Sequence, residues 1–248
     1  MRILWITHDP IRTAIGQGHS SSGFWKESLL KLLKEETADE ITVAFPGEEK
    51  KLVAENTYNF RYHSKKVFKE LPLLSESDLL WIINECKPDL IHIHGTEIPY
   101  GLLAKKTKIP IVISLQGFIS ECYNLVLGDI ALPVWSKEKT LKEYILKNSF
   151  IDMHNQWYQN SDCEIETVRV NKYFIGRTQF DRHFVAKHNA AAIYFSGNEL
   201  LRDEFYNKKW DLQKINRHSI YSSSFTNPLK GFHILLRAAG LLIQEFPD

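Results

Sequence analysis

The stretch "KPDLIHIHG" at residues 87–95 decides how this chain is expected to fold. Its centre, "LIHI", is a short apolar run, and such a run indicates a buried strand. Similar runs occur at 2–7, 40–46 and 109–117, with helical patterns between them at 24–36 and 75–89. Strands that are apolar on both faces and alternate with helices predict a parallel sheet with helices on both faces, in an open doubly wound α/β fold.

The later part of the chain continues this alternation less regularly. We expect a weaker strand at 58–64, a helix around 99–107, one long amphipathic helix over 135–162, strands at 172–176, 190–197 and 217–225, a helical segment at 199–210 and a last helix after Lys230-Gly231. Doubly wound sheets bind ligands at the carboxyl ends of their strands. The loops after Thr7, His94 and Leu115 are therefore where a site is expected.

Composition narrows the class of protein. The chain has 248 residues, of which 44% are hydrophobic and 25% charged, as in an ordinary globular protein with one large domain or one domain and part of a second. A formal net charge of +1 disfavours nucleic-acid binding. Three cysteines without a close pair fit a reducing cytoplasm, and the first apolar run is too short for a signal peptide or a membrane span. We therefore expect a soluble intracellular protein.

The loop after the first strand contains Gly16 and Gly18 but lacks the third glycine of a dinucleotide fingerprint, because Ser21 occupies that position. The loop is a poor NAD site. A long loop with glycines before a helix still suits an anionic or polyhydroxyl ligand, since free backbone N–H groups gather there. An ordinary surface loop is the alternative.

Two histidines, His92 and His94, alternate on one predicted strand and share a face. With a third ligand they could hold the metal of a hydrolase, but no further cluster at convincing spacing accompanies them. His92 could equally be a core residue, whereas His94, just before Gly95-Thr96-Glu97, is better placed for a ligand. Neither a G-x-S-x-G elbow nor a phosphate-binding Walker loop is present.

The last 22 residues, "NPLKGFHILLRAAGLLIQEFPD", predict a loop and then a helix that begins at Lys230-Gly231. A lysine at a helix start can bind a diphosphate as a point charge, with help from the helix dipole. An ordinary solvated lysine is the alternative reading.

Together with "RILWIT", "KPDLIHIHG", "IPIVISLQG" and "YFIGRTQFDR", this last segment resembles the retaining glycosyltransferases of GT-B fold known as family 4. The resemblance implies two Rossmann-like domains: an acceptor-side domain with a helical extension over 1–215, and the first strand and helix of a nucleotide-sugar-binding domain over 216–248. It also implies that the rest of the second domain, with the Glu-x7-Glu motif that binds the donor, is missing. A chain truncated in this way is expected to have little or no activity alone.

The resemblance carries over to particular residues. Gly16 and Gly18 match the family's glycine loop, and together with His94, Glu97 and Gln116 they are expected on the acceptor side. Gln116 stands where the family often has histidine; it can hydrogen-bond a sugar hydroxyl but cannot act as a base near neutral pH.

The donor diphosphate is expected at Lys230, Gly231 and Ser224, and no metal site is expected. Ser223-Ser224 stand where the family usually has Gly-Arg.

The implied function is transfer of a sugar, as a hexosyltransferase, from a nucleoside-diphosphate sugar to a glycan or lipid-linked acceptor with retention of configuration, in bacterial cell-surface polysaccharide synthesis. The resemblance implies no obligatory cofactor, a cytoplasmic location with contact at the inner membrane face, and a dimer or swap through helix 231–246. A non-catalytic Rossmann-like module that binds a ligand or a protein is the main alternative, and a metal hydrolase built on His92 and His94 is a third.

Overall fold

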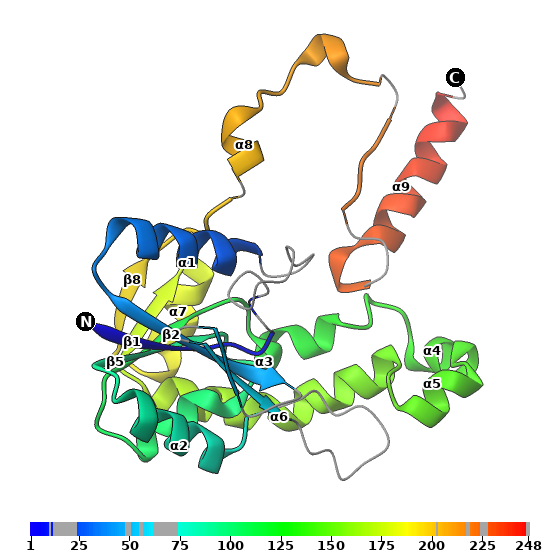
Figure 1. Ribbon diagram of the computed structural model, residues 1–248. Coiled ribbons are helices and arrows are strands. Elements are labelled where there is room, and N and C mark those ends of the chain that lie inside the picture. Colours follow the sequence, from blue (N-terminus) through cyan, green and yellow to red (C-terminus); the bar gives the residue numbers. More distant parts are fainter. Residues whose placement is uncertain are drawn as a thin grey trace. The chain divides into compact units, whose positions relative to one another are not determined.

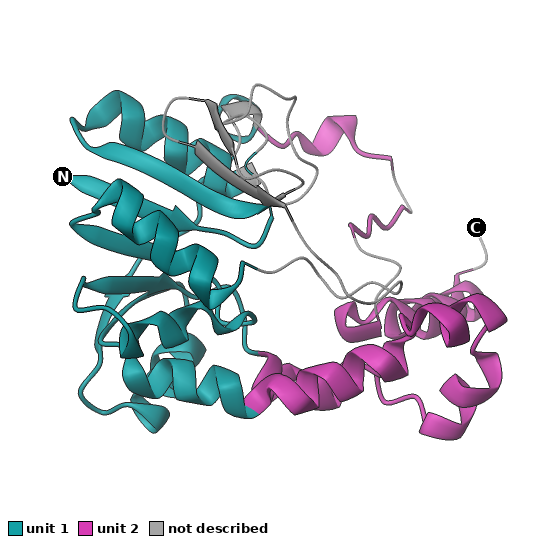
Figure 2. Ribbon diagram, turned by 60° about the horizontal axis from the view of Figure 1, so that its bottom comes forward, with its two compact units in different colours: residues 1–118, 162–208 teal, residues 119–161, 209–248 magenta. Residues whose placement is uncertain are grey.

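The computed structural model describes residues 1–9, 11, 24–47, 51–54, 57–61, 74–201, 203–216, 219–223 and 228–246 (Figure 1). The chain divides into two compact units, coloured separately in Figure 2. Unit 1 consists of residues 1–118 and 162–208, and unit 2 of residues 119–161 and 209–248. The domain boundary expected at 215/216 stays a prediction.

Unit 1 contains one sheet with eight strands in the part of the chain that the structure describes. The strands are β1 (Arg2–Ile6), β2 (Glu40–Gly47), β3 (Lys51–Ala54), β4 (Thr57–Arg61), β5 (Leu90–His94), β6 (Ile111–Ser114), β7 (Tyr173–Gly176) and β8 (Ile193–Ser196), in the order β3-β4-β2-β1-β5-β6-β7-β8. All neighbours are parallel except β3 and β4. The order reverses between β1 and β5, which makes this the switch point of a doubly wound sheet.

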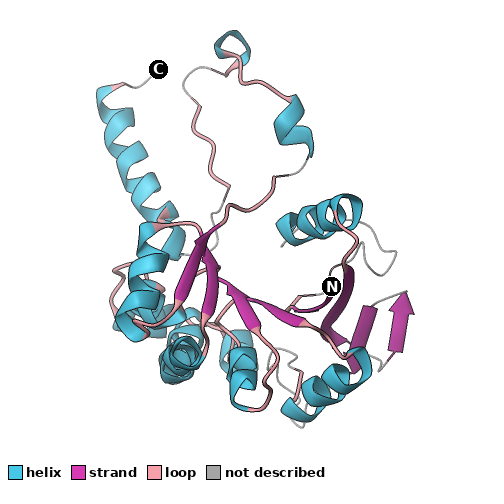
Figure 3. Cartoon of the chain, turned by 90° about the vertical axis from the view of Figure 1, so that its left-hand side faces the viewer, coloured by secondary structure: helices cyan, strands magenta, loops and turns pink. Residues whose placement is uncertain are grey.

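Helices cover both faces of this sheet, as Figure 3 shows. Those of unit 1 are α1 (Phe24–Glu36), α2 (Glu76–Cys86), the 3₁₀ helix η2 (Pro99–Lys105), α7 (Gln179–His188) and α8 (Asp203–Asn207); α6 (Phe150–Val170) begins in unit 2 and ends in unit 1. Strand alternation divides the core: Leu4 and Ile6 pack with residues of α2, α6 and α7, and Trp5 packs with α1 through Leu30. The predicted α/β class and the helices on both faces are confirmed.

Unit 2 is helical in its described residues. It contains α3 (Ile119–Cys122), η3 (Tyr123–Leu125), α4 (Leu132–Glu138), α5 (Leu141–Leu146), η4 (Leu212–Lys214), η5 (Pro228–Lys230) and α9 (Phe232–Glu245). The start of α9 lies against the turn at Gly128, where an added side chain would meet Pro228 and His233 at 2.7 Å. No helix that the structure describes is long and apolar enough to span a bilayer.

Two expectations about secondary structure were wrong. The single helix over 135–162 is three helices, because Thr140 and Ser149 each form a capping box that starts a new one. The strand expected at 217–225 is absent from its described residues, 219–223. Tyr221 there is 90% exposed, and no neighbouring strand in the described chain satisfies this backbone.

Candidate active site

Polar side chains gather at the carboxyl ends of β5, β6 and β7, which meet at one edge of the unit 1 sheet because these strands are parallel. We call this group the carboxyl-edge site, and it comprises Lys26, His94, Glu97, Gln116 and Arg177. The sequence predicted His94, Glu97 and Gln116 as site residues; all three lie in unit 1, and Glu97 and Gln116 approach the same glycine after β5.

The turn after β5 places Glu97 beside Gln116. Gly95 has φ +99°, which L side chains rarely adopt, and a Cβ there would collide with the Oε2 atom of Glu97. The same Cβ would lie 3.6 Å from Nε2 of Gln116. The carboxylate and the amide therefore approach the same glycine from two strand ends, and the absence of a side chain at this glycine gives them room.

Glu97 is partly buried, and its charge state is unusual. Burial, together with the negative charge of Glu164, raises the pKa of Glu97 from 4.5 to about 7, although backbone N–H groups of the turn and Lys26 favour the ionised form. At neutral pH this carboxyl group can therefore either donate or accept a hydrogen bond. Such a group can also exchange a proton with a bound hydroxyl near physiological pH.

Hydrogen bonds of Thr96 anchor the turn that follows β5. The Thr96 hydroxyl lies 2.8 Å from Oε1 of Glu164 and 3.3 Å from the Gly117 carbonyl oxygen, so it reaches both α6 and the loop after β6. Both Thr96 and Glu164 are buried, with 1% exposure each. A buried hydrogen bond to a charged group is among the stronger ones, and here it joins the turn after β5 to α6.

Lys26 contributes a buried cation from the first turn of α1. Its residue is only 5% exposed, and burial lowers its pKa, while Asp9, Glu97 and Glu27 oppose that shift. The ammonium group is therefore held among carboxylates near Glu97. Burying a charged ammonium group is costly unless opposite charges lie nearby, and these carboxylates supply them.

His94 and His92 lie on the α1 face of β5, in contact with each other and with Trp5. Nε2 of His92 lies 2.7 Å from the Ser114 hydroxyl oxygen, and burial lowers the pKa of His92 to about 4. Burial also lowers the pKa of His94 well below 6.5, with contributions from His92 and Lys26. Neither ring nitrogen of His94 has a hydrogen-bond partner within the described chain.

These histidines do not form a metal centre with other described residues. No group of three or more histidine, cysteine, aspartate or glutamate side chains in the described ranges could hold an ion. Both imidazoles are neutral near pH 7 because they are buried. The observed environment of His92 is that of a hydrogen-bonded core residue, which was one of the two readings of the sequence.

Arg177 connects the loop after β6 with the segment after β8. It follows β7, donates a 3.0 Å hydrogen bond from Nη2 to the Gln116 carbonyl oxygen, and forms a 2.8 Å ion pair with Glu199 after β8. Its side chain is 35% exposed, so the ion pair lies at the surface of the site. Three consecutive strand ends, β6 to β8, are thereby joined by one guanidinium.

The remaining predicted site residues are either in unit 2 or outside the described residues. Lys230 and Gly231 are in unit 2, where Lys230 is exposed and Gly231, with φ +73°, is the N-cap of α9. The predicted helix start at Lys230-Gly231 is thus present. Gly16, Gly18 and Ser224 lie outside the described residues.

The sequence reasoning did not predict Lys26, Glu164 or Arg177. Lys26 had a readable signal, because a lysine in the first turn of an amphipathic helix is unfavourable unless it is compensated. Arg177 follows directly on a predicted strand, where a site residue is expected. Glu164 is distant in sequence from the turn that it supports, and no local pattern identifies it.

Glu97 and Gln116 offer both donors and acceptors, the groups that a sugar hydroxyl pairs with. Lys26 lies near the carboxylates of Asp9, Glu97 and Glu27, and Arg177 forms an ion pair with Glu199.

Three solved structures align with part of this chain at low sequence identity. UDP-GlcNAc 2-epimerase from Methanocaldococcus jannaschii matches with a TM-score of 0.41 and 12% identity over 75% of this chain and 42% of that protein. The Neisseria meningitidis epimerase bound to UDP-GlcNAc gives 0.40 and 12%, over 75% and 43%. A Glycyrrhiza uralensis protein complexed with glycyrrhetinic acid 3-O-monoglucuronide gives 0.40 and 8%, over 79% and 48%.

The chain thus spans less than half the length of each of these proteins. No curated protein sequence matches it significantly. Residues 19–124, from before α1 to η3, match the family model described as Glycosyl transferase 4-like. Over this part of the chain, the match confirms the resemblance to family 4 glycosyltransferases that the sequence predicted.

Proposed function

We propose that this chain is part of a retaining glycosyltransferase and that its carboxyl-edge site binds the acceptor. The observation that carries the proposal is the approach of the Glu97 carboxylate and the Gln116 amide to the same glycine, Gly95, within the stretch that matches the glycosyl transferase model. Residues 1–215 would form the acceptor-side domain, and residues 216–248 would begin the domain that binds the nucleotide sugar.

At the acceptor side, Gln116 would orient the attacking hydroxyl and Glu97 would accept its proton. A carboxylate with a pKa of about 7 is a suitable base near neutral pH, because a useful fraction is ionised and the proton is held firmly. Gln116 cannot take this role, since an amide has no basic site at this pH. His94, buried with a lowered pKa, would be a neutral imidazole beside this pair.

At the donor side, the bond between the sugar C1 atom and the diphosphate oxygen breaks, and the acceptor oxygen forms the new bond on the same face of the sugar. Lys230, Gly231 and Ser224 would bind the departing diphosphate, with support from the N-terminus of α9. Cationic groups and N–H groups of this kind can neutralise the leaving group without a metal.

The finer parts of the proposal follow from family resemblance. The enzyme would transfer a hexose from a nucleoside-diphosphate sugar to a glycan or lipid-linked acceptor, in bacterial cell-surface polysaccharide synthesis. It would act in the cytoplasm, at the inner membrane face. A dimer or swap through helix 231–246 is consistent with the many exposed apolar side chains of α9, which has no buried residue in the described chain.

Saturation-transfer NMR tests the acceptor site on the 248-residue chain, with methyl glycosides of hexoses and N-acetylhexosamines as probes. We expect at least one glycoside to bind, and Glu97→Gln or Gln116→Ala to weaken binding about tenfold, the effect of losing one good hydrogen bond. Glu36→Gln and Gln213→Ala, at exposed positions outside the site, are matched controls and should bind as the wild type does. Binding that neither site variant weakens would contradict the proposal.

A further inference from the structure

We propose that an aromatic surface on α6 and η3 binds a neutral oligosaccharide through the faces of its pyranose rings. We call it the α6 aromatic surface, and it comprises Tyr123, His154, Asn155, Tyr158 and Gln159. All five residues lie in unit 2, and none of them belongs to the carboxyl-edge site. The inference therefore goes beyond the proposed function and does not depend on glycosyl transfer.

Three aromatic rings contact one another on this surface. The centroid of the Tyr123 ring lies 5.7 Å from that of His154 and 5.4 Å from that of Tyr158. His154 and Tyr158 are four residues apart on α6, which places them on the same side of the helix. Tyr123 comes from η3, so it reaches this side from another segment of the chain. Because each ring contacts a neighbour, the cluster is ordered before a ligand arrives, and binding costs less conformational entropy.

The ring cluster is open to solvent. Tyr158 is 62% exposed, and Tyr123 and His154 are partly exposed. Aromatic rings that only complete a core are largely buried, because their large apolar area gains most from leaving water. A substantial aromatic area of unit 2 is therefore accessible to a ligand.

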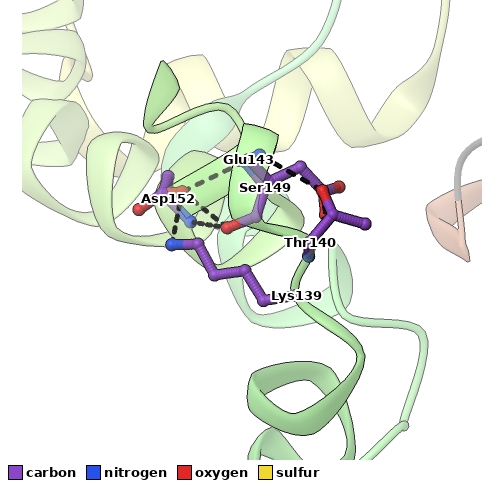
Figure 4. A network of polar contacts seen from close by, with 5 residues as sticks. All are labelled: Lys139, Thr140, Glu143, Ser149 and Asp152. Carbon is purple, nitrogen blue, oxygen red and sulfur yellow. Dashed lines mark hydrogen bonds and ion pairs between the residues drawn. The ribbon is translucent and has the colours of Figure 1, made fainter. Parts of the chain in front are cut away.

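A polar network fixes the start of the helix that carries the surface (Figure 4). The side chains of Ser149 and Asp152 cap α6 just before His154. Nζ of Lys139 lies 2.9 Å from Oδ2 of Asp152, in an ion pair whose side chains are only 18% and 23% exposed. Sites on helices hold ligand-binding groups more precisely than sites on loops, so the network favours a defined binding geometry.

Neutral amides flank the rings. Asn155 and Gln159 are exposed and stand four residues apart, on the side of α6 next to Tyr158. Oδ1 of Asn155 lies 3.2 Å from Nδ1 of His154, which joins this amide to the ring cluster. An amide group both donates and accepts hydrogen bonds, as a sugar hydroxyl does. The surface thus combines aromatic rings with groups that pair with hydroxyls.

Charge indicates the class of ligand. The two segments that carry the surface, 109–136 and 148–168, contain neither lysine nor arginine, although the chain has 31 such residues. Between Asp152 and Asp162, α6 has no carboxylate either. Nucleic acids and anionic lipids bind through lysine and arginine, which these segments lack. An uncharged ligand complements this surface best.

A glycan of glucopyranose units matches both parts of the α6 aromatic surface. The C–H groups of a glucopyranose ring are mainly axial, so its two faces are apolar while hydroxyls project from its rim. The faces of an aromatic ring carry partial negative charge and attract such polarised C–H groups. A protein partner would have to supply a matching polar group for each flanking amide, whereas every sugar unit carries hydroxyls that both donate and accept.

NMR titration of the whole chain, with isotope-labelled tyrosine rings, tests the proposal with cellopentaose and maltohexaose as probes. We expect at least one probe to shift the ring signals of Tyr123 and Tyr158. Tyr158→Ala should weaken binding, followed through Tyr123, about tenfold, because one aromatic contact is lost. Gln159→Ala should weaken it about fivefold through the loss of one hydrogen bond.

Matched variants separate this surface from general exposure of tyrosine and glutamine. Tyr221→Ala and Gln213→Ala change exposed residues of unit 2 that lie outside the α6 aromatic surface. Both proteins should bind the probes as the wild type does. Tyr158→Phe keeps the aromatic ring and should bind within about twofold of the wild type.

Four results would overturn the proposal. They are no binding of either oligosaccharide, binding that Tyr158→Ala leaves unchanged, equal weakening by Tyr158→Ala and Tyr221→Ala, and tyrosine shifts caused by the cationic peptide decalysine but by neither oligosaccharide. Glu97→Gln should leave the tyrosine shifts unchanged. The methyl glycosides that test the carboxyl-edge site report on the proposed function separately, so failure of one proposal does not imply failure of the other.

Discussion

The substitution Glu97→Gln should make the protein more stable at high pH. Glutamine resembles the protonated carboxyl group in shape and can still accept a hydrogen bond, but it cannot ionise. In the folded chain the pKa of Glu97 is raised to about 7, first by burial and then by the charge of Glu164. In the unfolded chain the group returns to its ordinary pKa of 4.5.

The sign and size follow from proton linkage. Between pH 4.5 and about 7 the folded state holds a proton that the unfolded state has lost, so the free energy of unfolding falls as pH rises through this window. A pKa raised from 4.5 to about 7 corresponds to a loss of about 3 kcal/mol, complete above about pH 7. His92 acts in the opposite direction between about pH 4 and 6.5, because burial lowers its pKa.

Urea unfolding followed by tryptophan fluorescence, at several values from about pH 5 to about pH 8, measures both proteins under the same conditions. Because the histidines are common to both, their contribution cancels in the difference between variant and wild type. We expect the free energy of unfolding of Glu97→Gln, relative to that of the wild type, to increase by about 3 kcal/mol as pH rises. A difference that does not change with pH would refute the raised pKa and the partly buried, acid-flanked position assigned to Glu97.

Three further substitutions test the packing around the site. Gly95→Ala should destabilise the fold by about 1–3 kcal/mol in urea unfolding, because of its positive φ and a collision with a neighbouring carboxylate, whereas Gly117→Ala, with nothing within 4 Å, should change it little. Ser114→Ala should cost about 1–3 kcal/mol by leaving buried His92 without its partner, and an unchanged midpoint would contradict that hydrogen bond. Lys139→Ala should lower stability by about 1 kcal/mol, and this loss should shrink when Asp152 is already alanine.

The sequence predicted the sheet of unit 1 well because its signals are local. The apolar runs that became β1, β2, β5 and β6 are short and separated by helical periodicity, and α1 occupies the predicted residues 24–36. The parallel arrangement of most neighbouring strands agrees with the doubly wound sheet that the alternation of strands and helices predicted. Hydrophobic patterning therefore sufficed where each element buries a large apolar face.

The secondary-structure predictions were wrong where a helix cap or the lack of a neighbouring strand determines the local structure. Periodicity alone cannot show that Thr140 and Ser149 interrupt a helix, although their acidic residues three positions later form readable capping boxes. The segment 219–223 has strand-like residues but no adjacent strand in the described chain. The same cap signal, at Thr178 and Asp181, would have identified α7, which we did not predict.

The sequence predicted where the candidate site lies, but it did not predict all of the residues that form it. Strand ends identified His94, Glu97 and Gln116, because loops at that edge carry ligands in this class of fold. Lys26 and Glu164 act through contacts with residues about 70 positions away in sequence, as the Thr96–Glu164 hydrogen bond shows. Such contacts exist only in the folded chain, and so does the raised pKa of Glu97.

The most direct test of the account is to map sugar binding on the isotope-labelled chain by NMR. Titration with the glycoside that binds best should shift the side-chain amide of Gln116 and the backbone amides of Gly95 to Glu97. Those shifts should weaken in Glu97→Gln, while exposed control residues such as Gln213 stay unchanged. If the bound sugar shifts other residues and leaves Gln116 and the Gly95–Glu97 turn unaffected, the carboxyl edge of this sheet is not the acceptor site.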